Sequence, residues 1–82
     1  MTIALTALEK IVLTQGVIEN PHYTESGWAW QNTVAIYSGL DSKIVRGVLT
    51  SLKSKGAVED DGNVGVDACV RPTEEGLEAA NA

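Results

Sequence analysis

Few side chains in this 82-residue sequence are suited to catalysis or metal binding, and those few are far apart. His22 is the only histidine and Cys69 is the only cysteine. A serine or cysteine nucleophile needs a base beside it, and a transition metal needs several nitrogen or sulfur ligands. Gly62 and Gly65 lack the lysine and the helix that follow in a phosphate-binding loop. We therefore expect no enzymatic activity, no metal site and no cofactor, and we interpret His22 as a surface or loop side chain.

Basic side chains, by contrast, are concentrated in one segment. Four of the six lysines and arginines lie between Ser42 and Gly56, a segment without acids. Its formal charge of +4, in a chain of net charge -5, leaves -9 on the rest. Segregated charge of this kind can present a basic face to phosphate. It is equally consistent with the solvated face of an ordinary helix, in which Lys53 and Lys55 suit the negative end of the helix dipole.

The basic segment forms the second half of a predicted pair of helices that spans residues 33–58. The pattern predicts a short helix, a tight turn at Ser38-Gly39-Leu40, and a longer helix that ends at Gly56. Apolar residues recur in the longer helix at spacings of three and four, which places them on one buried stripe. Asp41 or Ser42 can cap this helix. The members of the stripe are Val45, Val48, Leu49 and Leu52.

Before this pair, a first helix begins at Thr6, which forms a capping box with Glu9. One face of this helix is predicted to carry Leu8, Ile11, Val12 and Gln15, and Leu5 and Leu13 widen it. Gly16 either ends the helix or weakens it for one more turn. Pro21 stops it at the latest, because the residue before a proline is driven out of the helical region.

The stretch from Pro21 to Gly27 gives no clear pattern, and the following Trp28-Ala29-Trp30 allows two interpretations. It is either a very short strand or the approach to an early helix capped by Ser26. We expect at least one tryptophan in the core, although a pair of exposed tryptophans would indicate a protein-binding surface. The next helix is predicted to be capped by Gln31 or Asn32.

A hairpin and a last helix complete the predicted order. Residues 57–59 form a strand, residues 60–63 form a turn, and apolar residues then alternate from Val64 to Val70 as in a half-buried strand. In this alternation Cys69 falls on the face opposite Val70. Pro72 ends the strand, and Thr73 caps a helix that carries Glu74 and Glu75 in its first turn. The fold class predicted by this order is α+β.

These residues resemble a known family, the winged helix-turn-helix core of bacterial and phage regulators. The resemblance is carried by Ala35-x-x-x-Gly39-Leu40, by the apolar stripe, and by Lys55-Gly56-Ala57-Val58. The later PTEEGLEAA segment, residues 72–80, is similar to the helix entry after the wing in the multiple-antibiotic-resistance regulators (MarR group), with proline in place of leucine. The resemblance covers about residues 6–80 and implies a three-helix core, a two-stranded wing and a short last helix.

Sequence-specific binding of double-stranded DNA in transcriptional regulation is what the resemblance implies about function. The helix from Ser42 would lie in the major groove, and Arg46 could make a bidentate contact to guanine. Lys53 and Lys55 lie toward the far end of the helix and would at best touch the DNA backbone. Gly47 departs from the family because it offers no side chain to read a base, and it costs about 1 kcal/mol of helix stability relative to alanine. The expected DNA-binding residues are Ser42, Lys43, Arg46, Gly47, Thr50 and Lys53.

The wing favours a second interpretation. Family members that bind DNA commonly carry arginine or lysine at the wing tip, whereas this chain has Glu59, Asp60 and Asp61 there. Phosphate would repel these acids. The alternative is therefore a protein-interaction module that uses the acidic wing or the tryptophan face.

Length and composition set the remaining expectations. The 82 residues show no break in composition, so we expect a single domain, residues 1–82. No apolar run is long enough to span a membrane, and the first ten residues lack the basic start of a signal peptide. A single cysteine fits a reducing compartment, so we expect a cytoplasmic protein. Short terminal helices leave a monomer or a small homodimer as alternatives.

Overall fold

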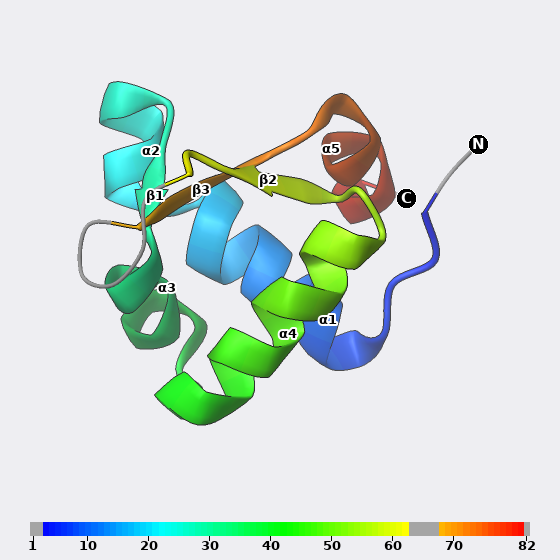
Figure 1. Ribbon diagram of the computed structural model, residues 1–82, viewed down its shortest axis with the longest axis horizontal. Helices are drawn as coiled ribbons and strands as arrows, with labels where there is room; N and C mark the ends of the chain where they lie inside the picture. The colour runs from blue at the N-terminus through cyan, green and yellow to red at the C-terminus, as the bar shows by residue number, and fades with distance from the viewer. Residues whose placement is uncertain (1–2, 63–67, 82) are drawn as a thin grey trace.

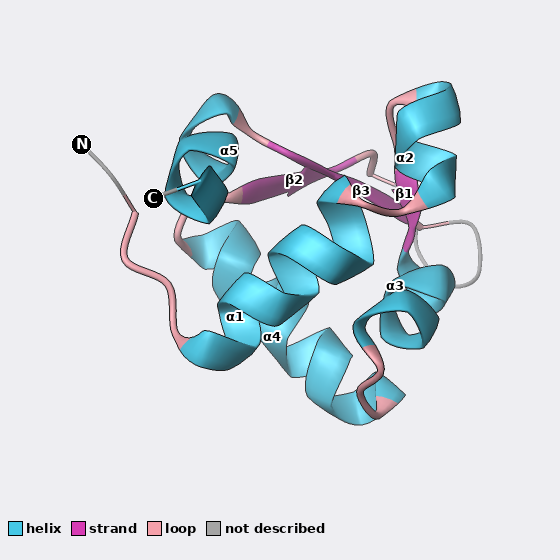
Figure 2. Ribbon diagram, turned by 180° about the vertical axis from the view of Figure 1, so that it is seen from behind, coloured by secondary structure: helices cyan, strands magenta, loops and turns pink. Residues whose placement is uncertain are grey.

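The computed structural model describes residues 3–62 and 68–81 and shows an α+β arrangement (Figure 1). Helices pack against one face of a small antiparallel sheet, and α2 and α5 lie at its opposite ends in both views (Figure 2). In chain order the elements are α1 (Ala7–Ile11), the π-helix η1 (Val12–Ile18), α2 (Pro21–Ser26), β1 (Ala29–Trp30), α3 (Gln31–Ser38), α4 (Ser42–Ser54), β2 (Val58–Asp60), β3 (Cys69–Pro72) and α5 (Glu74–Asn81).

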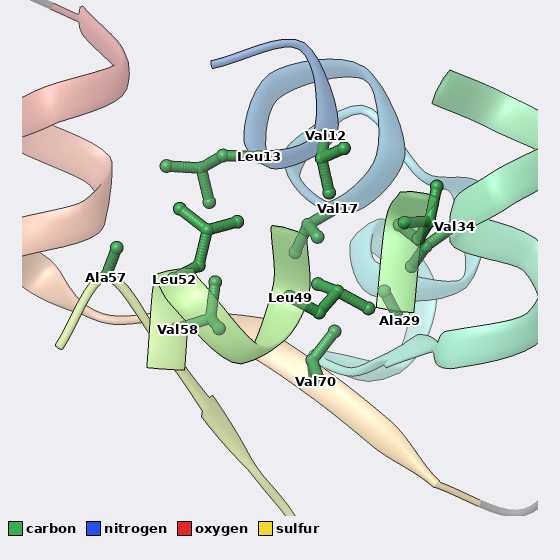
Figure 3. Close-up of a cluster of buried hydrophobic side chains, with 11 residues drawn as sticks. Val12, Leu13, Val17, Ala29, Val34, Leu49, Leu52, Ala57, Val58 and Val70 are labelled. Atoms are coloured by element: carbon green, nitrogen blue, oxygen red, sulfur yellow. The ribbon is translucent and has the colours of Figure 1, made fainter. Parts of the chain in front are cut away.

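The hydrophobic core lies between the sheet and the helices η1, α3 and α4 (Figure 3). The predicted stripe of α4 is confirmed, because Val45, Leu49 and Leu52 are buried and Val48 is half-buried against the core. From the sheet, Val58 and Val70 point toward these leucines. Burial of aliphatic side chains of this size stabilises a fold by about 1.5–3 kcal/mol each.

The first helix begins as predicted and continues past Gly16, which was the second of the two alternatives, but it presents a different face. The Thr6–Glu9 capping box is present. Beyond it the helix does not stop at Gly16 but changes to π geometry and continues to Ile18. A Cβ at position 16 would lie 2.6 Å from Val34 Cγ1, so the glycine allows α3 to approach closely. The buried residues are Val12, Leu13, Gly16 and Val17, whereas Leu8 and Gln15 are exposed and Glu9 is buried.

The undecided stretch after Pro21 is a helix, α2, which the sequence did not predict. Asn20 is fully buried and caps it, because its side-chain oxygen accepts a hydrogen bond from the His22 amide at 2.9 Å. The Asn20 amide nitrogen donates to the carbonyl of Gly16 at 2.9 Å and to the hydroxyl of Thr33 at 3.0 Å. Pro21 therefore begins a helix as well as ending one, since proline suits the first helical turn.

The helix pair around Gly39 is present as predicted. Gly39 ends α3 with a φ of 69°, and Gly56 follows α4 with a φ of 78°. Asp41 is the cap of α4, and its carboxylate accepts from the Lys43 amide at 2.8 Å. The predicted cap of α3 is wrong: the capping position is Trp30, without a side-chain hydrogen bond, and Gln31 is already helical.

The sheet has the strand order β1-β3-β2, and all pairs are antiparallel. Strand β2 begins at Val58, one residue later than predicted, and Cys69 is buried rather than facing outward. The predicted turn residue Asn63 and the alternation from Val64 lie outside the described residues. The expected core tryptophan is also wrong, because Trp30 is 50% exposed and neither tryptophan is in the core cluster.

Helix α5 is held against the segment that follows α4 by two residues, Thr73 and Gly76. Thr73 caps α5 as predicted, because its hydroxyl accepts from the Gly76 amide at 3.0 Å. The same hydroxyl donates to the carbonyl of Gly56 at 2.6 Å. A Cβ on Gly76 would lie 1.9 Å from the Ala57 carbonyl oxygen, so only glycine allows this contact.

Candidate functional site

The outer face of α4 carries the residues predicted to bind DNA. Since Val45, Leu49 and Leu52 are buried, positions about half a turn away must face outward. Five of the six predicted residues are exposed and the sixth, Lys53, is half-buried. The exposed ones are Ser42, Lys43, Arg46, Gly47 and Thr50.

The four basic residues of this segment do not act as a single group. Lys53 Nζ lies 3.6 Å from the carboxylate of Asp60 on β2, so one of the acids assigned to the wing partly neutralises α4. Lys55 Nζ lies 2.6 Å from Glu9 Oε1 and also donates to the carbonyl of Ala4 at 3.0 Å. Lys55 thus belongs to an internal network, which the sequence did not predict.

Glu9 is the centre of that network. Besides Lys55, its carboxylate accepts from the Thr6 amide at 2.8 Å and from the Ser51 hydroxyl at 2.5 Å. Burial alone would raise the pKa of this carboxyl, but the hydrogen bonds and the charge of Lys55 outweigh burial and lower the pKa to about 2. Glu9 is therefore ionised at neutral pH, and its charge offsets that of Lys55.

Lys43 and Arg46 remain as the outward cations. Neither side chain forms an ion pair with any residue in ranges 3–62 and 68–81. They lie three residues apart on the first two turns of α4, which places them on neighbouring positions of one face. This half of the helix is therefore the part with charge to offer an anionic partner.

Gly47 lies between these cations and Thr50 on the same face. No heavy atom lies within 4 Å of the position that its Cβ would take. Unlike Gly16 and Gly76, it is therefore not required by packing within the described part of the chain. A partner that approaches the helix backbone closely would account for a glycine here.

The helix pair also exposes large apolar side chains that the sequence analysis did not single out. Ile36 is 73% exposed, Tyr37 43% and Ile44 45%. Ile44 falls outside the apolar stripe of α4, and this position in the sequence indicates that its side chain is exposed. Apolar side chains at a DNA-facing position can contact the methyl group of thymine.

Possible metal ligands and long apolar helices can be followed through residues 3–62 and 68–81. Within these, no three His, Cys, Asp or Glu side chains are placed to bind a metal ion. None of the described helices combines the length and the apolar character needed to cross a membrane. Comparisons of the chain with protein-family models, with curated proteins and with solved structures gave no match.

Proposed function

We propose that this chain is a winged helix-turn-helix domain that binds double-stranded DNA through the first half of α4, in transcriptional regulation. The observation that carries the proposal is which of the four basic residues between Ser42 and Gly56 form ion pairs with acids. Lys53 and Lys55 are engaged by acids, whereas Lys43 and Arg46 face outward without an acidic partner among the described residues. Cationic side chains supply most of the affinity of a protein for DNA.

The arrangement of the elements supports the same proposal. Helix α4 follows α3 after a three-residue turn, and its outer face is open to solvent. The antiparallel pair β2–β3 and then α5 follow α4, in the order of the wing and last helix of the family that the sequence resembles. A recognition helix of this kind reads base edges with its N-terminal residues.

In this proposal each outward residue has a distinct role. Arg46 makes a bidentate contact to guanine, and Lys43 binds phosphate. Ser42 and Thr50 contact phosphate or base edges, and Gly47 lets the backbone of α4 approach the groove. Lys53 contributes less, because Asp60 competes for its charge.

Arg46→Ala tests the proposal, with Lys10→Ala as a matched control that removes one positive charge from α1. Binding of each variant to a duplex selected from a random library is measured by fluorescence anisotropy. We expect Arg46→Ala to weaken specific binding about tenfold or more, the loss typical of a bidentate base contact. Lys10→Ala should leave binding within about twofold. Equal binding by Arg46→Ala and the wild type would contradict the assignment of α4 as the reading helix.

A further inference from the structure

The outer face of the sheet carries a row of side chains that the proposed DNA surface does not include. Arg71 on β3 lies between Glu59 on β2 and Trp28 next to β1. Its guanidinium carbon is 4.5 Å from the centroid of the Trp28 ring, and its Nε donates to the Glu59 carboxylate. Beside this row, the His22 ring of α2 stacks on Trp30 with a centroid distance of 4.8 Å.

An open groove of about 570 Å³ continues from this row between α2 and α5. Tyr23 lies on the side of α2, Leu77 and Glu74 lie on the side of α5, and Arg71 borders the groove from the sheet. The ends of the sheet at which α2 and α5 lie are visible in both ribbon views (Figures 1 and 2). The groove thus combines apolar and aromatic walls with a carboxylate at one side.

The charges around the groove are acidic. The charge of Arg71 is offset by Glu59, so this pair adds no net charge. The two flanking helices carry four glutamates and no lysine or arginine. Of these, Glu74 lines the groove, is exposed, and forms no ion pair with a described residue. The groove would repel a phosphate-rich ligand. A ligand that carries a cation next to an apolar group would match both the acidic charge and the apolar walls of the groove.

We propose that this groove binds a basic segment of a partner protein. An arginine or lysine of the segment pairs with Glu74, and a neighbouring apolar side chain packs against Tyr23 and Leu77. Tryptophan, tyrosine and arginine are the residue types that dominate the energy of protein interfaces. Tyr23 and Arg71 line this groove, and Trp28 lies beside it under Arg71. None of the α4 residues proposed to bind DNA takes part, so the two proposals are independent of each other.

The test uses the full chain and two amidated octapeptides, one alternating arginine with leucine and the other alternating glutamate with leucine. Binding is followed by tryptophan fluorescence and by backbone amide shifts in NMR. We expect the arginine peptide to bind, with the largest shifts at Tyr23, Arg71 and Leu77, and the glutamate peptide not to bind.

Two charge reversals on one helical turn give a matched comparison. Glu74→Lys should weaken binding of the arginine peptide about tenfold, whereas Glu75→Lys, which changes the same charge outside the groove, should change it less than about twofold. Circular dichroism melting verifies that both variants fold. The proposal is overturned if the arginine peptide does not bind, if the shifts map elsewhere, if the glutamate peptide binds equally well, or if both reversals weaken binding equally.

Discussion

Glu9 connects two parts of the fold that are far apart in the sequence. Through Thr6 it caps α1, and through Ser51 and Lys55 it holds the last turn of α4. Its pKa of about 2 lies below the ordinary value of 4.5 because these hydrogen bonds favour the ionised form. The contribution of Glu9 to stability is therefore complete above pH 4.5 and is lost as the pH falls from there through 2.

Replacing Glu9 by glutamine should lower the free energy of unfolding at pH 7 by about 2 kcal/mol, because Lys55 loses its partner. The difference between wild type and variant should shrink as the pH is lowered from 5 to about 2. Urea denaturation at several pH values measures both effects, with Glu78→Gln on the exposed face of α5 as the control. A constant difference between Glu9→Gln and the wild type across this pH range would contradict the role assigned to the Glu9 carboxylate.

At the scale of the elements, three helix caps and the turn at Gly39 are predictable from the sequence, whereas the cap of α3, the whole of α2 and the contacts between distant elements are not. The caps at Thr6, Asp41 and Thr73 and the turn at Gly39 depend on residues within a few positions, so their signals are local. Helix α2 is not predicted because Asn20 and Pro21, which end the preceding helix, also cap and begin the next one.

For the candidate site, the sequence located the outward residues of α4 but not the partners of its cations. The pairs Lys55–Glu9 and Lys53–Asp60 join separate elements, and no periodicity predicts them. The covering of Trp28 by Arg71 depends on strand register in the same way. A hydrophobic pattern gives the face of a residue but not its neighbour across the fold.

Two helical glycines should respond oppositely to replacement by alanine. Gly47→Ala should stabilise the protein by about 1 kcal/mol, because alanine is the better helix former and the site is open. Gly76→Ala should destabilise it by about 2 kcal/mol or more, because the new methyl group meets the Ala57 carbonyl. Thermal melting of the two variants checks the prediction. Stabilisation by both replacements would contradict the close contact between α5 and Ala57.

The whole molecule separates its charges. The outer face of α4 carries the cations Lys43 and Arg46, which have no acidic partner among the described residues, and the charged side chains of α2 and α5 at the ends of the sheet are all glutamates. Asp60 lies next to α4, and its negative charge offsets the positive charge of Lys53. The net charge of -5 thus leaves one small basic surface, and binding of a polyanion through it should be weak but localised.

Replacing Asp60 by asparagine should strengthen DNA binding, because Lys53 is released and one negative charge near the duplex is removed. The steepness of the salt dependence should rise by about one unit in the log–log slope, as expected for one further phosphate contact. Glu78→Gln removes the same charge from α5 and should change neither quantity. Anisotropy titrations at several salt concentrations measure both. Equal effects of the two replacements would mean that only net charge matters.

The most direct test of the central claim is the salt dependence of DNA binding by the unaltered chain. Fluorescence anisotropy against random duplex DNA at low salt, repeated at two higher salt concentrations, gives the slope. On random duplex DNA Lys43 and Arg46 both contact phosphate and Lys53 is a partial third, so the log–log slope should be about -2 to -3. Absence of binding at low salt would contradict the assignment of α4 as a DNA-binding helix, because the acids of the remaining chain would then prevail.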